Sequence, residues 1–239
     1  MSPLAPRAGT PDRTDGGRAL GSWHAGEYVA GWLEQDVIGD MLAMPRRLSA
    51  ALVADAGVDV RHVVDLGAGA GPYLQVLLDA FPAARGTWSD SSQPMLETAR
   101  ERLAAYADRV DFVIGDAQDL AGIDTPPADV IVTSRVVHHF APATIRRLYR
   151  EACARLRPGG FFFNLDHYGA PGDWVGRYRR IRYDFIGRPK SDLPPHRHDV
   201  PFSLPAEHLG WLHEAGFEAP DVPWSMFYTA LLAARAPSA

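Results

Sequence analysis

The stretch VVDLGAGAG, residues 63–71, decides the fold of this protein. A short apolar strand is predicted at residues 62–66, and a loop with glycine at every second position follows it. Residues 73–81 then show helical periodicity, which Pro82 ends. Glycine lets a ligand approach the main chain closely, and the start of a helix offers free N–H groups. The stretch therefore predicts a strand, a loop and a helix that together bind a dinucleotide or another adenosine compound.

The alternation of strand and helix continues on the C-terminal side of this stretch. Further strands are predicted at residues 86–89, 110–114, 129–134, 161–165, 217–222 and 225–233. Helices are predicted at residues 94–106, 143–156 and 205–215. Strands that alternate with helices indicate a parallel, doubly wound sheet. The predicted fold class is therefore α/β, with a mainly parallel, seven-stranded sheet.

Three other segments complete the predicted domain organisation. Residues 1–20 are rich in Gly, Pro, Arg and Asp, and we expect a flexible tail. Residues 21–60 predict an N-terminal helical cap in which Pro45 separates two helices. Residues 61–239 form the sheet domain, with an insertion at 167–204. Because the insertion mixes aromatic residues with arginines and interrupts the rhythm of strands, we expect a substrate lid.

Composition narrows the class of protein. Of the 239 residues, 46% are hydrophobic and 22% are charged, which is typical of a globular chain. The formal net charge of −5 does not favour binding to nucleic acid. A single cysteine excludes an internal disulfide, and no apolar run reaches the roughly 18 residues that cross a bilayer. We therefore expect a cytoplasmic monomer or homodimer that has neither nucleic acid nor a membrane as a partner.

Two carboxylates follow the second and third predicted strands. Asp90 can accept hydrogen bonds from the two hydroxyls of a ribose, and Asp116 can accept one from an adenine amino group. The carboxyl ends of parallel strands meet at one edge of a sheet, where ligands of open α/β folds bind. The two acids and the glycine loop are therefore expected to form one site.

The motifs VVDLGAGAG, WSDSS followed by PMLETARERL, GDAQDL, SRVVHHF and LRPGGFFF lie within residues 62–165. Together they resemble a class I S-adenosylmethionine-dependent methyltransferase, with its Rossmann-like fold. A nicotinamide oxidoreductase is disfavoured, because the loop has GxGxG spacing followed by Pro72 instead of GxGxxG. The resemblance implies S-adenosylmethionine as the cofactor, held by Asp65, Gly67, Ala68, Gly69, Gly71, Asp90, Ser91, Asp116, Ala117 and Arg135.

Histidines near the predicted sheet edge are candidates for the chemistry. A methyltransferase aligns its acceptor in line with an electrophilic sulfonium methyl, and a histidine can take a proton from the acceptor. The candidates are His167, where the insertion begins, and His138 and His139 after the fourth strand, although paired histidines can also support packing. Contacts to a small aromatic or acidic acceptor, of the kind used in specialised metabolism, are expected from Tyr28, Trp32, His139, Asp166, His167, Tyr178 and Arg182.

The sequence leaves two other functions open. A chain with these motifs can bind S-adenosylmethionine without transferring its methyl group, as a scaffold or as the catalyst of another rearrangement. Methylation of RNA is opposed by the negative net charge and by the lack of an added basic domain. His196, His198 and Asp199 have spacing that metal ligands can have, but methyl transfer needs no metal, and no metal site is expected.

Overall fold

The computed structural model describes residues 22–34, 41–186 and 201–238. The expected flexible tail at 1–20, the histidines at 196–198 and the side chain of Trp32 lie outside these residues. Within the described ranges, no group of three His, Cys, Asp or Glu side chains is placed to hold a metal ion. In the same part of the chain, no helix is long and apolar enough to cross a membrane.

A seven-stranded sheet forms the centre of the fold, as predicted. Its strands, from one edge to the other, are β3 (Val110–Ile114), β2 (Arg85–Asp90), β1 (His62–Leu66), β4 (Ala128–Ser134), β5 (Leu156–His167), β7 (Thr229–Arg235) and β6 (Glu218–Met226). Strands β1 to β5 are parallel, and β7 is antiparallel to both β5 and β6. The strand order reverses between β1 and β4, which is where ligands bind in sheets of this kind.

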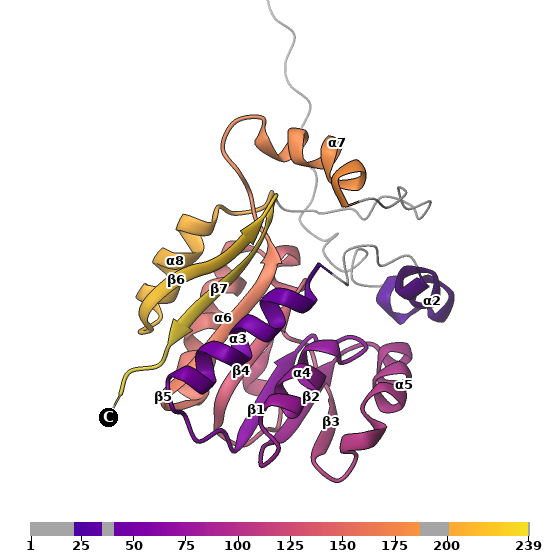
Figure 1. Ribbon diagram of the computed structural model, residues 1–239, viewed down its shortest axis with the longest axis vertical. Coiled ribbons are helices and arrows are strands. Elements are labelled where there is room, and N and C mark those ends of the chain that lie inside the picture. The colour runs from indigo at the N-terminus through magenta and orange to yellow at the C-terminus, as the bar shows by residue number, and fades with distance from the viewer. Residues whose placement is uncertain (1–21, 35–40, 187–200, 239) are drawn as a thin grey trace, which may run out of the picture.

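Helices cover both faces of the sheet (Figure 1). The described helices are η1 (Ser22–His24), α2 (Gly26–Glu34), α3 (Ala43–Asp55), α4 (Pro72–Ala80), α5 (Gln93–Arg102), η2 (Ala104–Tyr106), η3 (Leu120–Gly122), η4 (Val137–His139), α6 (Pro142–Arg155), α7 (Trp174–Ile186) and α8 (Pro205–Glu214). The insertion predicted to be a lid thus contains α7, and its residues 187–200 lie outside the described part.

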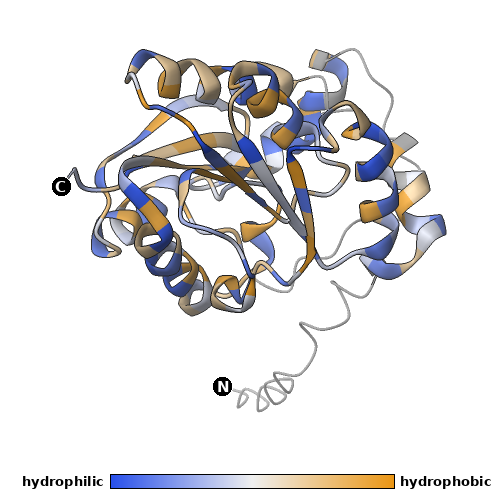
Figure 2. Cartoon of the chain, turned by 90° about the horizontal axis from the view of Figure 1, so that it is seen from below, coloured by the Kyte–Doolittle hydropathy of each residue, from blue (hydrophilic) through white to orange (hydrophobic). Residues whose placement is uncertain are grey.

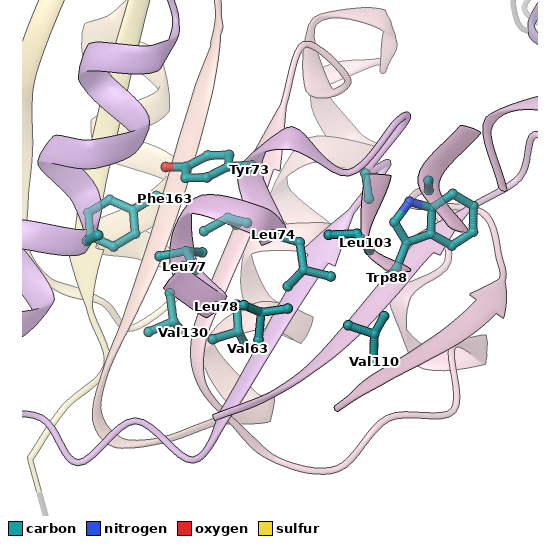
Figure 3. Packing of buried hydrophobic residues seen from close by; sticks show 14 of the residues in the cluster. Val63, Tyr73, Leu74, Leu77, Leu78, Trp88, Leu103, Val110, Val130 and Phe163 are labelled. Atoms are coloured by element: carbon teal, nitrogen blue, oxygen red, sulfur yellow. The ribbon is translucent and has the colours of Figure 1, made fainter. Parts of the chain in front are cut away.

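Side chains of successive strand residues join hydrophobic clusters on opposite faces. Val63 packs with residues of α3, α4 and α5, whereas Val64 packs with residues of α6 and α8. Figure 3 shows Leu74, Leu77 and Leu78 of α4 above the strands of the first cluster. Each such buried aliphatic side chain contributes about 1.5–3 kcal/mol. The helices around the sheet carry both hydrophobic and hydrophilic residues (Figure 2), as helices with one buried face do.

Three boundaries differ from the prediction. Pro45 lies in the first turn of α3 and does not separate two helices, because an N–H in a first turn has no intrahelical acceptor to lose. Strand β5 spans Leu156–His167 and is longer than the predicted 161–165, because Leu156 already pairs with Ala128 across a register shift. The final hairpin turns at Phe227, not near Pro223, because the edge strand β6 accommodates its prolines at irregularities.

Candidate active site

The glycine loop between β1 and α4 has a backbone that only glycine adopts without strain. Gly67, Gly69 and Gly71 have φ angles of 62°, 54° and 78°. A Cβ on Gly67 would lie 2.3 Å from the Cγ2 atom of Val136. A Cβ on Gly69 would meet no heavy atom nearer than the Met95 sulfur at 3.8 Å. The main chain at Gly69 is therefore open to close approach by a ligand.

Asp90, at the end of β2, holds this loop. Its Oδ2 accepts a hydrogen bond from the Gly69 N–H at 2.9 Å, and its Oδ1 accepts one from the Ser92 N–H at 2.8 Å. The indole N–H of Trp88 donates to the Gly69 carbonyl at 2.8 Å. Burial raises the pKa of Asp90, and the two N–H donors offset part of this rise. Each carboxylate oxygen has a second lone pair, so Asp90 can still accept from ribose hydroxyls.

The turn after β3 lies beside Asp90, because the Gly115 N–H donates to the Asp90 carbonyl at 3.1 Å. The side chain of Asp116 is exposed and accepts a hydrogen bond from the Gln118 N–H at 2.8 Å. Ala117 is buried, and Ser91 is exposed next to Asp90. The structure thus brings the predicted ribose and adenine residues to one edge of the sheet.

Asp65 supplies a buried carboxylate below the loop. Its Oδ2 accepts from the Leu74 N–H at 3.1 Å, while its Oδ1 is buried and has no hydrogen-bond partner among the described residues. Burial raises the pKa of this carboxyl to about 7. The hydroxyl of Ser134 on β4 is also buried without a partner in the described chain. Asp65 is paired with Val132, two residues before Ser134, so both unpaired groups lie on the same side of the sheet.

These unpaired atoms fit the amino-acid end of S-adenosylmethionine. A buried carboxylate oxygen without a partner is costly unless a donor reaches it, and the ammonium group of the methionine portion is such a donor. The open main chain at Gly69 lies in the loop that follows Asp65 along the chain. The carboxylate of Asp90, at the end of β2, binds this loop. The residues present therefore suit the cofactor that the motifs imply.

Arg46 is a candidate that the sequence analysis missed. It lies in the first turn of α3, is 6% exposed, and its charge lowers the pKa of Asp65, which burial raises. Positions 46, 49, 50 and 53 form the buried face of α3. An arginine among small and apolar residues at that spacing was the available signal. The guanidinium is suited to the carboxylate of a methionine portion whose ammonium meets Asp65.

His138 and Asp166 form a buried pair at the ends of β4 and β5. The Nδ1 atom of His138 lies 2.5 Å from the Asp166 Oδ1. The backbone N–H of His138 donates to the other carboxylate oxygen, Oδ2, at 3.1 Å. The His167 N–H also donates to Asp166 at 2.8 Å. Burial alone would raise the pKa of Asp166, but these partners hold it below its ordinary value. With Nδ1 bound to the carboxylate, the imidazole presents Nε2 as its second nitrogen.

His139 and His167 surround the ring of His138. The ring centroids lie 4.0 Å and 5.1 Å from that of His138. The Nδ1 atom of His167 is 3.0 Å from the Thr229 hydroxyl of β7. Burial holds the pKa of His167 well below its ordinary value. His167 is therefore a neutral imidazole near pH 7 and pairs with Thr229 instead of with the carboxylate of Asp166.

The predicted acceptor contacts divide between two places. Arg182 of α7 lies 5.4 Å above the ring of Tyr228, whose centroid is 5.1 Å from that of His167. The ring of Tyr178 meets Phe227 at 5.8 Å. Tyr28 instead contacts Trp23 beside α5, on the cofactor side. The structure brings Arg182 to the histidine end of the site and Tyr178 to the tip of the β6–β7 hairpin beside it, and it places Tyr28 against Trp23.

Arg135 lies between the two ends of the site. Its φ of 59° is rare for a residue with a side chain, and its N–H donates to the Leu165 carbonyl at 3.0 Å. The backbone at Arg135 therefore turns sharply at the end of β4, where the resemblance predicts a contact with the methionine portion.

Residues 63–160 match a family model described as a methyltransferase domain. The chain belongs to the class I S-adenosylmethionine-dependent methyltransferases.

Two relatives and a solved structure illustrate the membership. Trans-aconitate 2-methyltransferase of Mycolicibacterium gilvum is 30% identical over 69% of this chain and 66% of its own length. Ornithine lipid N-methyltransferase of Singulisphaera acidiphila is 32% identical over 57% of this chain and 73% of its own. Human N-acetylserotonin methyltransferase, solved in complex with S-adenosylmethionine, superposes with a TM-score of 0.65 and 17% identity over 90% of this chain and 58% of that one. At this identity the last comparison concerns the fold alone.

The chain spans only part of several relatives. It covers 31% and 29% of two curated proteins, from Streptomyces purpurascens and Streptomyces lavendulae, that are 33% and 32% identical to it. Membership of the family therefore does not carry over the substrates of these proteins.

Proposed function

We propose that this protein transfers the methyl group of S-adenosylmethionine to an oxygen of a small aromatic or acidic acceptor. The observation that carries the proposal is the sheet edge itself, where the loop at Gly69, the unpaired Asp65 and the ribose acceptor Asp90 lie next to the histidine cluster. When bound there, S-adenosylmethionine supplies an electrophilic methyl group on sulfur. The protein's residues supply the rest of the mechanism.

Four side chains hold the cofactor in this proposal. Asp65 accepts from the ammonium, and Arg46 donates to the carboxylate at the amino-acid end. Asp90 accepts from the ribose hydroxyls, and Asp116 accepts from the adenine amino group. Because these residues come from neighbouring elements of one sheet edge, they would hold the cofactor beside the ends of β4 and β5.

His138 is the general base of the proposed mechanism. Its Nε2 would take the proton of an acceptor hydroxyl, and Asp166 would stabilise the imidazolium that results. His167, neutral and bound to Thr229, contacts the acceptor, and His139 packs on the base. Of the three histidines that the sequence offers as candidates, this proposal makes His138 the base and His167 a contact to the acceptor.

The charge of the acceptor end supports an acidic acceptor. The guanidinium of Arg182 lies over the ring of Tyr228, which contacts His167, and the charges of Arg135 and Arg182 both lower the pKa of His167. A carboxylate is a natural partner for such groups. The M. gilvum relative is named for a small acceptor, trans-aconitate, which agrees with this class of substrate.

Calorimetry with S-adenosylmethionine, S-adenosylhomocysteine and NAD tests the cofactor. We expect both sulfur compounds to bind with a dissociation constant of about micromolar, near −8 kcal/mol, and NAD not to bind. Absence of binding by both sulfur compounds would overturn the proposal.

Turnover is a separate test. Release of S-adenosylhomocysteine in a screen of hydroxylated aromatic acids and their neutral amides is expected for the acids. Binding of the cofactor without turnover of any acceptor would favour the alternative, a protein that binds S-adenosylmethionine without transferring its methyl group.

A further inference from the structure

Helix α7 presents an apolar face to solvent. Trp174, Tyr178, Ile181 and Phe185 recur at intervals of four, three and four residues, which places them on one side of the helix. Trp174 and Ile181 are each 49% exposed, and Phe185 is 69% exposed. A row of large exposed apolar side chains on one element differs from scattered exposure and marks a surface that binds something.

This apolar face touches the rest of the protein only in part. The rings of Tyr178 and Phe185 meet the ring of Phe227, at the tip of the β6–β7 hairpin, with centroid distances of 5.8 Å and 5.5 Å. The exposed fractions of Trp174, Ile181 and Phe185 remain large despite these contacts. Phe227 therefore supports the face without covering it.

The remainder of α7 is basic. The helix has four arginines and one aspartate, whereas the whole chain has a net charge of −5. Arg177 pairs with Asp173 at 2.9 Å, and Arg182 lies over Tyr228. Arg179 and Arg180 are exposed, and neither forms an ion pair or hydrogen bond with another described residue. The positive charge of Arg179 and Arg180 therefore faces solvent.

The helix also lies where a flat surface can reach it. In Figure 1, α7 stands beyond the carboxyl ends of the strands, at one end of the described part of the molecule. A helix that combines exposed tryptophan and phenylalanine on one side with arginines around it has the composition of helices that lie in a lipid–water interface.

We propose that α7 docks the protein on an anionic lipid surface. Trp174, Ile181 and Phe185 enter the boundary between headgroups and acyl chains, and Arg179 and Arg180 extend to the lipid phosphates. Clustered arginines are attracted to anionic lipid even when the whole protein is negative, because the attraction acts within a Debye length of the surface. This contact does not depend on the proposed function, and it revises the expectation from composition that no membrane takes part.

Cosedimentation with vesicles tests this contact. Full-length protein is mixed with vesicles of phosphatidylcholine alone, or of phosphatidylcholine with phosphatidylglycerol, at low and high salt. We expect binding to the mixed vesicles, weakened by salt, and little binding to the neutral ones. Trp174→Ser with Phe185→Ser is expected to weaken binding about tenfold or more. Arg179→Gln with Arg180→Gln is expected to weaken it by about tenfold and to reduce its dependence on salt.

Matched controls come from exposed residues elsewhere. Arg47→Gln with Arg150→Gln removes two exposed arginines from α3 and α6, and Met44→Ser removes a side chain that is 64% exposed. These variants are expected to bind vesicles like the unchanged protein. Circular dichroism and the calorimetric affinity for S-adenosylmethionine are measured on every variant. They show whether each variant is folded, and they report on the proposed function separately from lipid binding.

Three outcomes would overturn the proposal. The first is absence of binding to the mixed vesicles at low salt. The second is an equal loss of binding in the control and α7 variants. The third is a protein that ignores vesicles but changes from dimer to monomer when Trp174 and Phe185 are replaced, as seen by analytical ultracentrifugation. In that case a second copy of the chain covers the face.

Discussion

The sheet edge has two halves that are built differently: the proposed cofactor half, around Asp65, Gly69 and Asp90, and the proposed acceptor half, around the histidine cluster. In the cofactor half, main-chain N–H groups of the glycine loop and of the start of α4 bind carboxylates, since Asp90 accepts from Gly69 and Asp65 accepts from Leu74. In the acceptor half, side chains from distant segments meet, as His138 meets Asp166 and His167 meets Thr229. A loop fixed by its backbone suits one constant ligand. A cluster of side chains from several segments can change with the acceptor.

The largest effect is expected from the acceptor half. His138→Gln should lower kcat about 10²–10⁴-fold, the usual contribution of a general base, while the affinity for S-adenosylmethionine stays the same. Steady-state kinetics and calorimetry measure the two quantities. His139→Gln is the matched control, because its ring packs on that of His138 and is given no proton to take in this proposal, and it should lower kcat far less. Near-normal kcat in the His138 variant would exclude this residue as the base.

The next effect is on the folding of the cofactor half. Gly67→Ala adds a Cβ at a positive φ and 2.3 Å from Val136, so the free energy of unfolding should fall by about 2–5 kcal/mol. Gly57 has a φ of 68° and open space around it, so Gly57→Ala should cost only the backbone strain, about 1–2 kcal/mol. Urea unfolding measures both. Adding Val136→Ala should restore part of the stability of the Gly67 variant, and equal losses in the two single variants would contradict the steric account.

A substitution in each half should affect the affinity for S-adenosylmethionine differently, and Asp90→Ala is the one expected to weaken it. We expect the affinity for S-adenosylmethionine to fall by about 1.5–3 kcal/mol, the range for hydrogen bonds that involve a charged group. Asp166→Asn changes a carboxylate of the acceptor half and should leave that affinity unchanged. Calorimetry on both variants decides, and an unchanged affinity after Asp90→Ala would remove the ribose assignment.

A smaller effect is expected from the titration of Asp65. Its pKa of about 7 in the folded protein exceeds the ordinary value of 3.8. The folded state therefore holds more protons than the unfolded chain between these values, and the stability of the ligand-free protein should fall as pH rises through this window. The slope is at most about 1.4 kcal/mol per pH unit. Urea unfolding at several pH values should show this slope, and Asp65→Asn should lack it.

The affinity for the cofactor should depend on pH in the opposite direction from the stability of the ligand-free protein. An ammonium group beside Asp65 favours the ionised carboxyl, so the affinity for S-adenosylmethionine should rise with pH through the same window, with release of a proton. Calorimetry in buffers of different ionisation enthalpy measures that proton. An Asp65→Asn variant with the same proton release would assign it to another group.

The loop geometry of the proposed cofactor half could be predicted because its requirements are local. Glycine at every second position predicts a loop with positive φ angles. The acids follow strands that can be identified from their apolar residues, as at Val110–Ile114. Asp90 needs only its place at the end of β2 to reach the loop. These features can be identified without knowing how the helices pack.

The acceptor half was less accessible from the sequence. His138, His167 and Asp166 could be named as polar residues after strands, but their pairing depends on how β4 and β5 align. Thr229 enters because β7 is antiparallel to β5 and places it opposite His167. Arg46, on the cofactor side, was missed for the same reason, because it reaches the site only through the packing of α3 beside α4. Contacts of this kind depend on tertiary packing, which periodicity does not report.

The position of β7 between β5 and β6 has a consequence for the order of events during synthesis. Strands β1 to β5 leave the ribosome first and can pair with one another. His167 can form its hydrogen bond with Thr229 only after the ribosome has synthesised β7, because the two residues are separated by 62 positions. Pairing over such a separation is slow, because a long loop must close before the contact forms. We therefore expect a nascent chain that binds the cofactor early and completes its acceptor site late.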